Sequence, residues 1–204
     1  MRAPFPTRRQ LLSRALAGGA ATCAGVALVP LAGPADALAA EPVSDASLVQ
    51  SLLAAELLAA AVYERVLATG LLSARAAGVA QLALAHEHAH AAALRPELRS
   101  LGATAPPAPA DSQAIDNALS DHHVSRSVSD LHRERDCLDL LLDLENLMEG
   151  AYYAAMSKLS HPRLQQLGAQ VLASEAQHYA LLGELRRHQD FSRAVPYAFV
   201  EGRY

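Results

Sequence analysis

Two copies of a Glu-x-x-His motif are the residues of this sequence best placed to do chemistry. The first copy is Glu87 with His90, and the second is Glu175 with His178. Residues three positions apart lie on one face of a helix, so each copy directs a carboxylate and an imidazole to the same point. Oxygen and imidazole ligands without thiolate suit iron or manganese, with zinc as a further candidate. The motifs therefore predict a metal site if their helices face one another.

A longer repeat surrounds each motif. A further glutamate precedes the motif, by 31 residues for Glu56 and by 30 residues for Glu145. Each of these glutamates is followed after seven residues by a tyrosine, Tyr63 or Tyr152. Bundles that bind two metal ions take one Glu from each of two helices and a Glu-x-x-His motif from each of the other two. The sequence supplies this whole set, as Glu56, Glu87, His90, Glu145, Glu175 and His178.

Four segments carry apolar residues at every third or fourth position, which is typical of amphipathic helices. Serine favours the residue before a helix and glycine the residue after it, so these residue types indicate helix ends. The four predicted helices run from Ser44 or Ser47 to Gly70, from about Ser73 to Leu101, from Ser129 or Asp130 to about Leu159, and from Pro162 to at least Leu185. The predicted ligands lie on the apolar faces of these helices, where a bundle core would enclose them.

The connection between the second and third predicted helices is much longer than the other two. Its sequence at 105–109, Ala-Pro-Pro-Ala-Pro, cannot be helical, so we expect a loop over 103–129 with at most a turn of helix near Ile115. Short, long and short connections give two antiparallel hairpins joined by one crossover. The prediction is an all-α four-helix bundle with one long crossover over residues 41–190. An irregular tail at 191–204 is expected to pack on it through Phe191, Tyr197 and Phe199.

Composition agrees with a helical fold and excludes some partner classes. Hydrophobic residues make up 51% of the chain and aromatic residues 4%, with no Trp, which favours helices over sheet. The net charge of −4 offers no basic face to nucleic acid. Cys23 and Cys137 are the only cysteines, and Cys23 lies in a segment expected to be removed. No disulfide framework is therefore predicted.

The first forty residues predict a signal for export. Arg8 and Arg9 are followed by an uncharged Ala/Gly-rich run over 15–35 and by small residues over 37–40, which is the order of a secretory signal. Adjacent arginines with weak hydrophobicity favour the twin-arginine route, and hence a periplasmic or other extracytoplasmic location. The alternative is an N-terminal membrane anchor, for which the glycines and Pro30 are unfavourable. No stable membrane span is expected in the mature chain, after residue 40.

The negative charge of the predicted site favours the binding of metal cations. Four buried carboxylates would repel one another if nothing neutralised them. Two divalent cations supply four positive charges against these four negative ones. We expect Glu87 and Glu175 to bridge the two ions, and the two tyrosines of the repeat to hydrogen-bond carboxylates. Each ion then has one terminal pair of ligands, Glu56 with His90 or Glu145 with His178.

These six residues resemble the ligands of the ferritin-like superfamily, and in particular those of bacterioferritin, rubrerythrin and the small subunit of ribonucleotide reductase. A first-helix Glu followed by a Tyr seven residues later is also found there. The resemblance covers about Ser47 to His188, points to small bacterial ferritin-like proteins with an exported context, and implies two bound iron ions. His88 stands where bacterioferritin has its haem-ligating Met, so no haem is expected. Rubredoxin-like Cys pairs are missing, so electrons would come from outside.

The predicted function is redox chemistry at two iron ions, with manganese as the alternative metal. The reaction expected is oxidation of ferrous iron with oxygen or peroxide as acceptor, or removal of peroxide. One alternative is a metal-free exported bundle with a structural or stress-related binding role, which could form a homodimer through its apolar outer faces. Another is oxidation of a substrate in a pocket lined by small residues, Ala55, Ala59, Ala60 and Ala151.

Three polar residues near the predicted ligands leave alternatives open. Glu149 follows Glu145 by four residues and lies on nearly the same helix face. It is interpreted either as an alternative ligand or gating carboxylate, or as a half-exposed helix residue. His86 and His88 flank Glu87, and we expect surface histidines, with contact between one of them and a ligand as the alternative.

Overall fold

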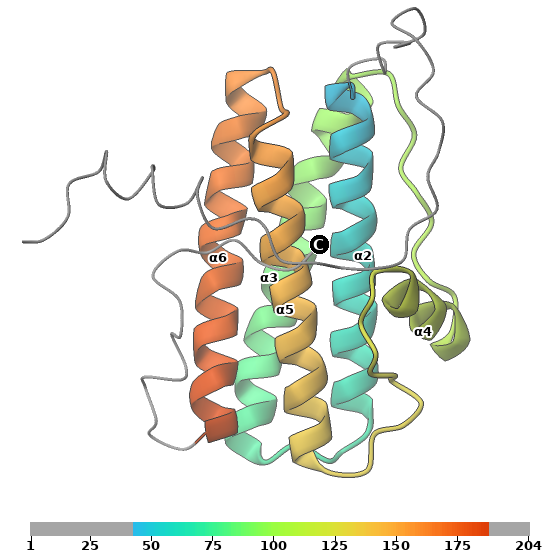
Figure 1. The fold of residues 1–204 in the computed structure, drawn as a ribbon, viewed down its shortest axis with the longest axis vertical. Coiled ribbons are helices and arrows are strands. Elements are labelled where there is room, and N and C mark those ends of the chain that lie inside the picture. Colours follow the sequence, from blue (N-terminus) through green and yellow to red (C-terminus); the bar gives the residue numbers. More distant parts are fainter. Residues whose placement is uncertain (1–42, 188–204) are drawn as a thin grey trace, which may run out of the picture. The chain divides into compact units, whose positions relative to one another are not determined.

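The structure, a computed structural model, describes residues 43–187. Over this range it contains five α-helices joined by loops (Figure 1). The expected signal at 1–40 and the expected tail at 191–204 lie outside the described residues. The helices are α2 (Asp45–Ala68), α3 (Ala74–Ser100), α4 (Ser112–Asp121), α5 (Glu134–Met156) and α6 (Pro162–Arg187).

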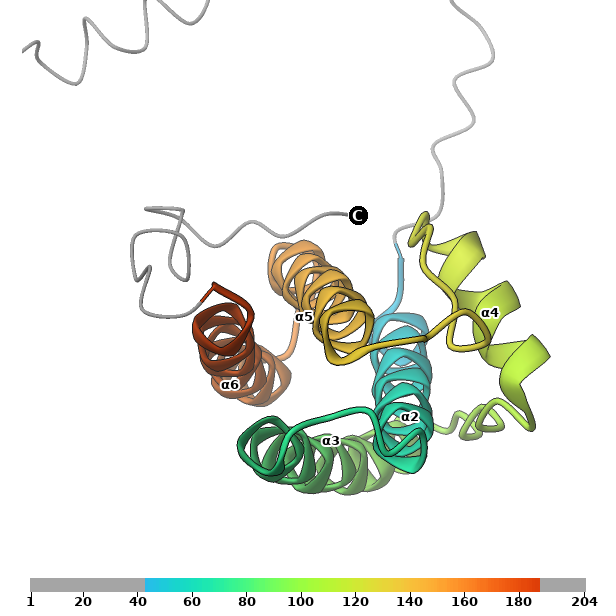
Figure 2. The same ribbon diagram turned by 90° about the horizontal axis from the view of Figure 1, so that it is seen from below.

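Four long helices form a bundle built from two hairpins. Helix α2 packs along α3 and α5 packs along α6, while α2 with α5 and α3 with α6 close the bundle. Figure 2 shows these four helices end-on, with the short α4 outside them against α2. The predicted all-α bundle of two hairpins joined by one crossover is confirmed.

Side-chain caps set the helix ends near the expected positions. The Ser44 side chain accepts a hydrogen bond from the backbone N–H of Ser47 at the start of α2, and Ser73 does the same for Ala76 in α3. Gly70, which follows α2, has φ of 68°, a left-handed conformation that glycine adopts without steric cost. The tight turn from α2 to α3 therefore has a local cause in the sequence.

The crossover differs from the prediction in two ways. Instead of a single turn near Ile115 it contains the ten-residue helix α4, whose Ile115 and Leu119 are buried. Helix α5 begins at Glu134, later than the predicted start at Ser129 or Asp130. Ser129 lies too far before Glu134 to cap the helix and belongs to the preceding loop, where its hydroxyl donates to Asp116 of α4 at 2.6 Å.

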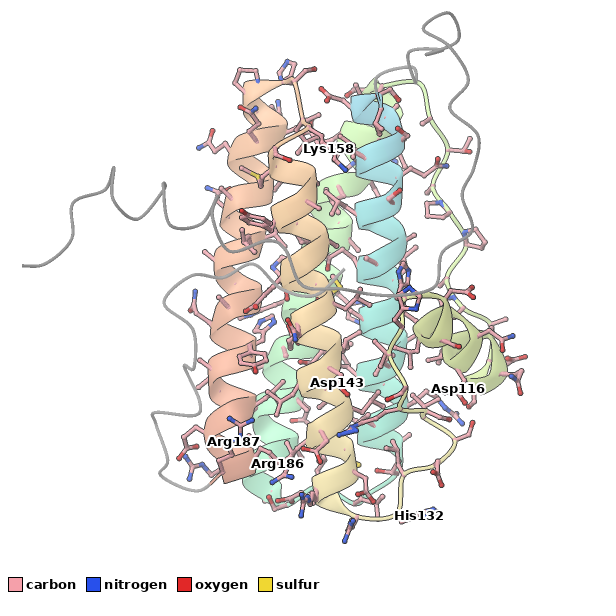
Figure 3. The ribbon with its side chains drawn as sticks, in the orientation of Figure 1. Asp116, His132, Asp143, Lys158, Arg186 and Arg187 are labelled. Atoms are coloured by element: carbon pink, nitrogen blue, oxygen red, sulfur yellow. The ribbon has the colours of Figure 1, made fainter. Side chains whose placement is uncertain are left out.

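Asp116, labelled in Figure 3, joins helix α4 to the loop that precedes α5. Its carboxylate accepts hydrogen bonds from the hydroxyls of Ser127 and Ser129 and from the backbone N–H of Val128, at 2.6 to 2.7 Å. Burial alone would raise the pKa of Asp116, but these hydrogen bonds lower it. The ionised carboxylate therefore holds the loop that leads into α5.

We predict that Asp116→Ala lowers the free energy of unfolding by about 1–3 kcal/mol at neutral pH, because it removes an acceptor shared by three donors. A carboxylate with a lowered pKa in the folded state stabilises above its unfolded pKa, and this contribution is lost as pH falls through the folded pKa. The difference from the wild-type chain should therefore shrink in acid, as urea unfolding at several pH values would measure. Asp121→Ala, on the same helix, is the control, and an equal effect of both substitutions would contradict the role of Asp116.

Helix α2 is the one helix within residues 43–187 whose length and composition would allow it to cross a membrane. However, 56% of its most apolar 18-residue stretch is buried inside the bundle. Leu53, Val62 and Tyr63 of this helix are fully buried, and Glu56 lies among them. Packing in the bundle core accounts for the apolar character of α2.

Candidate metal centre

All six predicted ligands lie in the interior of the bundle, contributed by its four long helices. The four glutamates have no exposed surface, and His178 is buried as well. His90 is the most accessible, with 13% of its side chain exposed. Each helix places its predicted ligands on the face that carries its buried apolar residues, so burial of that face also buries the ligands. The ligands, from α2 to α6, are Glu56, Glu87, His90, Glu145, Glu175 and His178.

The ligand atoms converge in two overlapping groups. Within each group every residue offers one nitrogen or oxygen atom, and these atoms lie within 4.8 Å of one another. Glu87 and Glu175 belong to both groups. The first group adds Glu56 and His90, and the second adds Glu145 and His178. The side chains are thus grouped as the repeat predicts, and their role as metal ligands stays a prediction.

The two shared carboxylates are oriented so that each turns one oxygen to each group. Glu175 Oε1 lies 3.0 Å from His90 Nδ1, and Glu175 Oε2 lies 3.2 Å from His178 Nδ1. Glu87 Oε2 lies 3.7 Å from His90 Nδ1, and Glu87 Oε1 lies 3.1 Å from His178 Nδ1. Both carboxylates therefore have the orientation needed to bridge two cations.

The terminal carboxylates use one oxygen for the centre and the other for a tyrosine. Tyr63 of α2 donates its hydroxyl hydrogen to Glu145 Oε1, and Tyr152 of α5 donates to Glu56 Oε1. Each tyrosine thus holds the glutamate of the other helix. Burial raises the pKa of Tyr63 well above its ordinary value, so the phenol remains a donor at neutral pH.

Six atoms that point into the centre have no hydrogen-bond partner among residues 43–187. His178 Nδ1 hydrogen-bonds Glu175 Oε2 at 3.2 Å, whereas His90 Nδ1 makes no hydrogen bond although carboxylate oxygens lie 3.0 to 3.7 Å from it. Buried polar atoms without partners are costly, and a cation would satisfy all of these at once. The chemistry of these residues therefore fits bound metal. These atoms are Glu56 Oε2, Glu87 Oε1 and Oε2, His90 Nδ1, Glu145 Oε2 and Glu175 Oε1.

The carboxylates strongly favour protonation of the two imidazoles. Burial alone would lower the pKa of both, but three carboxylates surround each ring. They raise the pKa of His90 to about 11 and that of His178 to about 12. Without metal, the imidazolium ions compensate part of the buried negative charge.

The carboxyl groups of Glu56, Glu145 and Glu175 differ in the direction of their pKa shifts. Burial, with the charges of Glu87 and Glu175, raises the pKa of Glu56 to about 8, and burial likewise raises the pKa of Glu145 well above its usual range. Burial would raise the pKa of Glu175 too, but contacts with His178 and other partners lower it to about 2. Metal binding requires deprotonated ligands, so it would release protons and become tighter as pH rises.

Glu149 is nearly buried, with 7% of its surface exposed, and so is not the half-exposed helix residue of one interpretation. Burial, followed by the negative charge of Glu175, raises its pKa to about 7. It belongs to neither group of converging atoms, so it supplies no ligand atom in this arrangement.

His86 is the residue at the centre that sequence reasoning underestimated. We expected a surface histidine, but it is half-buried and its Nδ1 lies 2.9 Å from Nε2 of His178. His88, in contrast, is exposed and lies 3.5 Å from Glu64. The sequence did contain a signal for His86, because it lies four residues before His90 and therefore on the same helix face, with the two ring centroids 6.4 Å apart.

Two of the four small residues expected near a substrate pocket line a cavity, but not one at the centre. Ala55 and Ala151 line a surface pocket of about 330 Å³ between α2 and α5, together with Lys158. None of the six ligands lines this pocket. This pocket is therefore not the one expected beside the six predicted ligands.

We predict that Tyr63→Phe and Tyr152→Phe each lower the free energy of unfolding by about 1–3 kcal/mol, because each leaves a buried carboxylate oxygen without its donor. Urea unfolding of the metal-free chain would measure this. Tyr153→Phe is the matched control, since Tyr153 is 43% exposed on the same helix as Tyr152. Equal stability of the three variants would contradict the role given to the two buried tyrosines.

Comparison with known proteins gives one finding. A family model described as a ferritin-like domain matches residues 44–188. No curated protein and no solved structure matches the chain. The match spans more than half of the sequence and all four helices of the bundle, including every residue of the two ligand groups. The chain therefore belongs to the ferritin-like domain family.

Proposed function

We propose that this ferritin-like protein binds two iron ions, or alternatively two manganese ions, and acts as an oxidoreductase. The observation that carries the proposal is the orientation of Glu87 and Glu175, each with one oxygen toward each imidazole. With iron bound, two ferrous ions can become ferric while two electrons and two protons reduce oxygen to hydrogen peroxide, or hydrogen peroxide to water.

The energetics of the metal-free core support this proposal. Without metal the buried cluster depends on bound protons, because the pKa values of Glu56 and Glu145 are raised and both imidazoles are protonated at neutral pH. The effective cost of a buried ion is several kcal/mol unless it is paired. A helical bundle with a purely structural role would be more stable with apolar residues at these six positions. Metal binding explains why the sequence has destabilising polar residues there.

The residues around the ligands keep the site ordered and dry. The hydroxyls of Tyr63 and Tyr152 fix the terminal carboxylates, so their free oxygens point inward. Leu141, Leu144 and Met148 are fully buried on α5, the helix of Glu145. Their packing limits access of bulk water, which strengthens electrostatic interactions within the site.

An anaerobic titration with ferrous iron followed by oxygen tests the proposal. We expect binding to saturate at two ions per chain, one per ligand group. Exposure to oxygen or peroxide should then produce an absorbance rise in the near ultraviolet as ferric iron forms. The metal-free bundle, as monomer or homodimer, predicts neither saturable binding nor the absorbance rise, and that result would contradict the proposal.

We also propose that residues 1–40 direct export by the twin-arginine route. Replacing both Arg8 and Arg9 by Lys keeps the charge but removes the paired guanidinium groups. The doubly substituted chain should accumulate as a precursor in the cytoplasm, as cell fractionation would measure. Arg14→Lys should leave export unchanged and serves as the control. Unchanged export of the double variant would contradict this route.

A further inference from the structure

The six predicted ligands of the two halves correspond, but the residues directly before the two motifs differ. Glu87 corresponds to Glu175 and His90 to His178, so the residue before each motif should also correspond. That residue is His86 in α3 and Ser174 in α6. A long side chain therefore stands in one half where a short one stands in the other.

His86 reaches across from α3 to the ligand imidazole of α6. Its Nδ1 lies 2.9 Å from Nε2 of His178, and the ring planes are inclined by only 25°. The ring centroids are 5.1 Å apart, nearly the largest separation that a 2.9 Å contact between ring nitrogens allows. The two nitrogens therefore point directly at one another, as in a well-formed hydrogen bond.

This hydrogen bond selects one form of His178. A histidine that binds metal through Nδ1 must present a lone pair there, so the hydrogen of the neutral ring is on Nε2. With His86 Nδ1 as the acceptor, the hydrogen on His178 Nε2 is held in place whether or not metal is bound, and the ring keeps its Nδ1 facing Glu87, Glu145 and Glu175. His178 is thus held at both nitrogens.

His90 lacks this second contact. Its Nδ1 faces the carboxylates of Glu56, Glu87 and Glu175, but no side chain of the described residues hydrogen-bonds its Nε2. Ser174, in the position that corresponds to His86, lies beside His178 on its own helix instead, with Oγ 3.5 Å from Nε2. His90 is also more exposed than His178, with 13% against 3% of the side chain.

We propose that His86 is a positioning residue that makes the two metal positions unequal. The position formed with Glu145 and His178 binds its ion more tightly, and the position formed with Glu56 and His90 exchanges its ion faster. This inference deepens the proposed function and depends on it. Residues that orient a metal-ligating histidine typically change metal affinity by about 10–100-fold, and His86 supplies that support to one position alone.

Stepwise titration of the metal-free full-length chain with cobalt(II), followed by visible absorbance and calorimetry, tests this inference. The wild-type chain should show two affinities that differ by about 10-fold or more. In His86→Ala the tighter affinity should fall by about 10–100-fold. His86→Asn should restore much of it, because an amide oxygen can accept the same hydrogen bond from Nε2. His88→Ala, an exposed residue two positions away, is the control.

Substitution of one terminal ligand assigns the effect to a position. In a chain that also carries Glu56→Gln, His86→Ala should still weaken the remaining site, whereas with Glu145→Gln it should have little effect. Wild-type sites of equal affinity, or equal weakening by His86→Ala and His86→Asn, would overturn the inference while leaving the proposed function intact. A wild-type chain that binds no cobalt(II) would overturn both. Circular dichroism of each metal-free variant verifies that it folds.

Discussion

Replacing Glu175 by Gln should reduce the metal content of the reconstituted full-length chain from two ions to less than one. Glu175 supplies one oxygen to each ligand group, so its loss weakens both positions together. The amide has nearly the same shape but no charge, and it is a much poorer ligand for a hard cation. We expect affinity at both positions to fall by more than about 100-fold, beyond the effect of losing a supporting residue.

Comparison with a terminal ligand makes this prediction specific. Glu56 belongs to one group alone, so Glu56→Gln should leave one ion bound, in the position of Glu145 and His178. Glu184→Gln is the control on α6, because Glu184 pairs with Arg75 at 2.9 Å and belongs to neither ligand group. Metal analysis after removal of unbound ions gives the content of each variant. Equal loss in Glu56→Gln and Glu175→Gln would contradict the distinction between shared and terminal ligands.

Metal should raise the stability of the chain by an amount that is easy to measure. A ligand at 100 times its dissociation constant stabilises the state that binds it by about 2.7 kcal/mol, so two occupied positions give about 5 kcal/mol. For a chain of this size that corresponds to a rise in Tm of about 10–20 °C. The physical reason is that the cations pair with buried carboxylates that otherwise repel one another.

Differential scanning calorimetry with and without a chelator would measure this rise. Glu175→Gln is the informative variant, since it should be nearly indifferent to metal while keeping the same fold. If wild-type and variant chains gain equally from metal, the ions bind elsewhere and stabilise the protein for another reason.

Most of the fold could be predicted because long amphipathic helices carry a strong periodic signal. The spacing of Leu48, Leu52 and Val62 predicted helix α2, and Pro162 indicated where α6 begins. Helix α4 was missed because it is only ten residues long and follows a Pro-rich segment, so Ile115 and Leu119, four residues apart, show the helical spacing only once. The start of α5 was misplaced because Ser129 bonds to Asp116, a contact between loop and helix that local pattern does not show.

The ligand groups were predictable for a related reason, since both motifs repeat with their flanking glutamate and tyrosine. The pairing of the tyrosines required the arrangement of the helices. Seven residues along a helix is about 10 Å, so Tyr63 cannot reach Glu56 of its own helix. Antiparallel packing instead brings it to Glu145 of α5. The role of His86 depends on a contact between α3 and α6, and no spacing within one helix shows such a contact.

The most direct test of the central claim is an anomalous difference map from crystals of the full-length chain loaded with iron or manganese. Two peaks should lie inside the bundle, one within each ligand group, and both should be contacted by Glu87 and Glu175. Ions bound only at the protein surface, or an interior in which these carboxylates contact no metal, would contradict the claim.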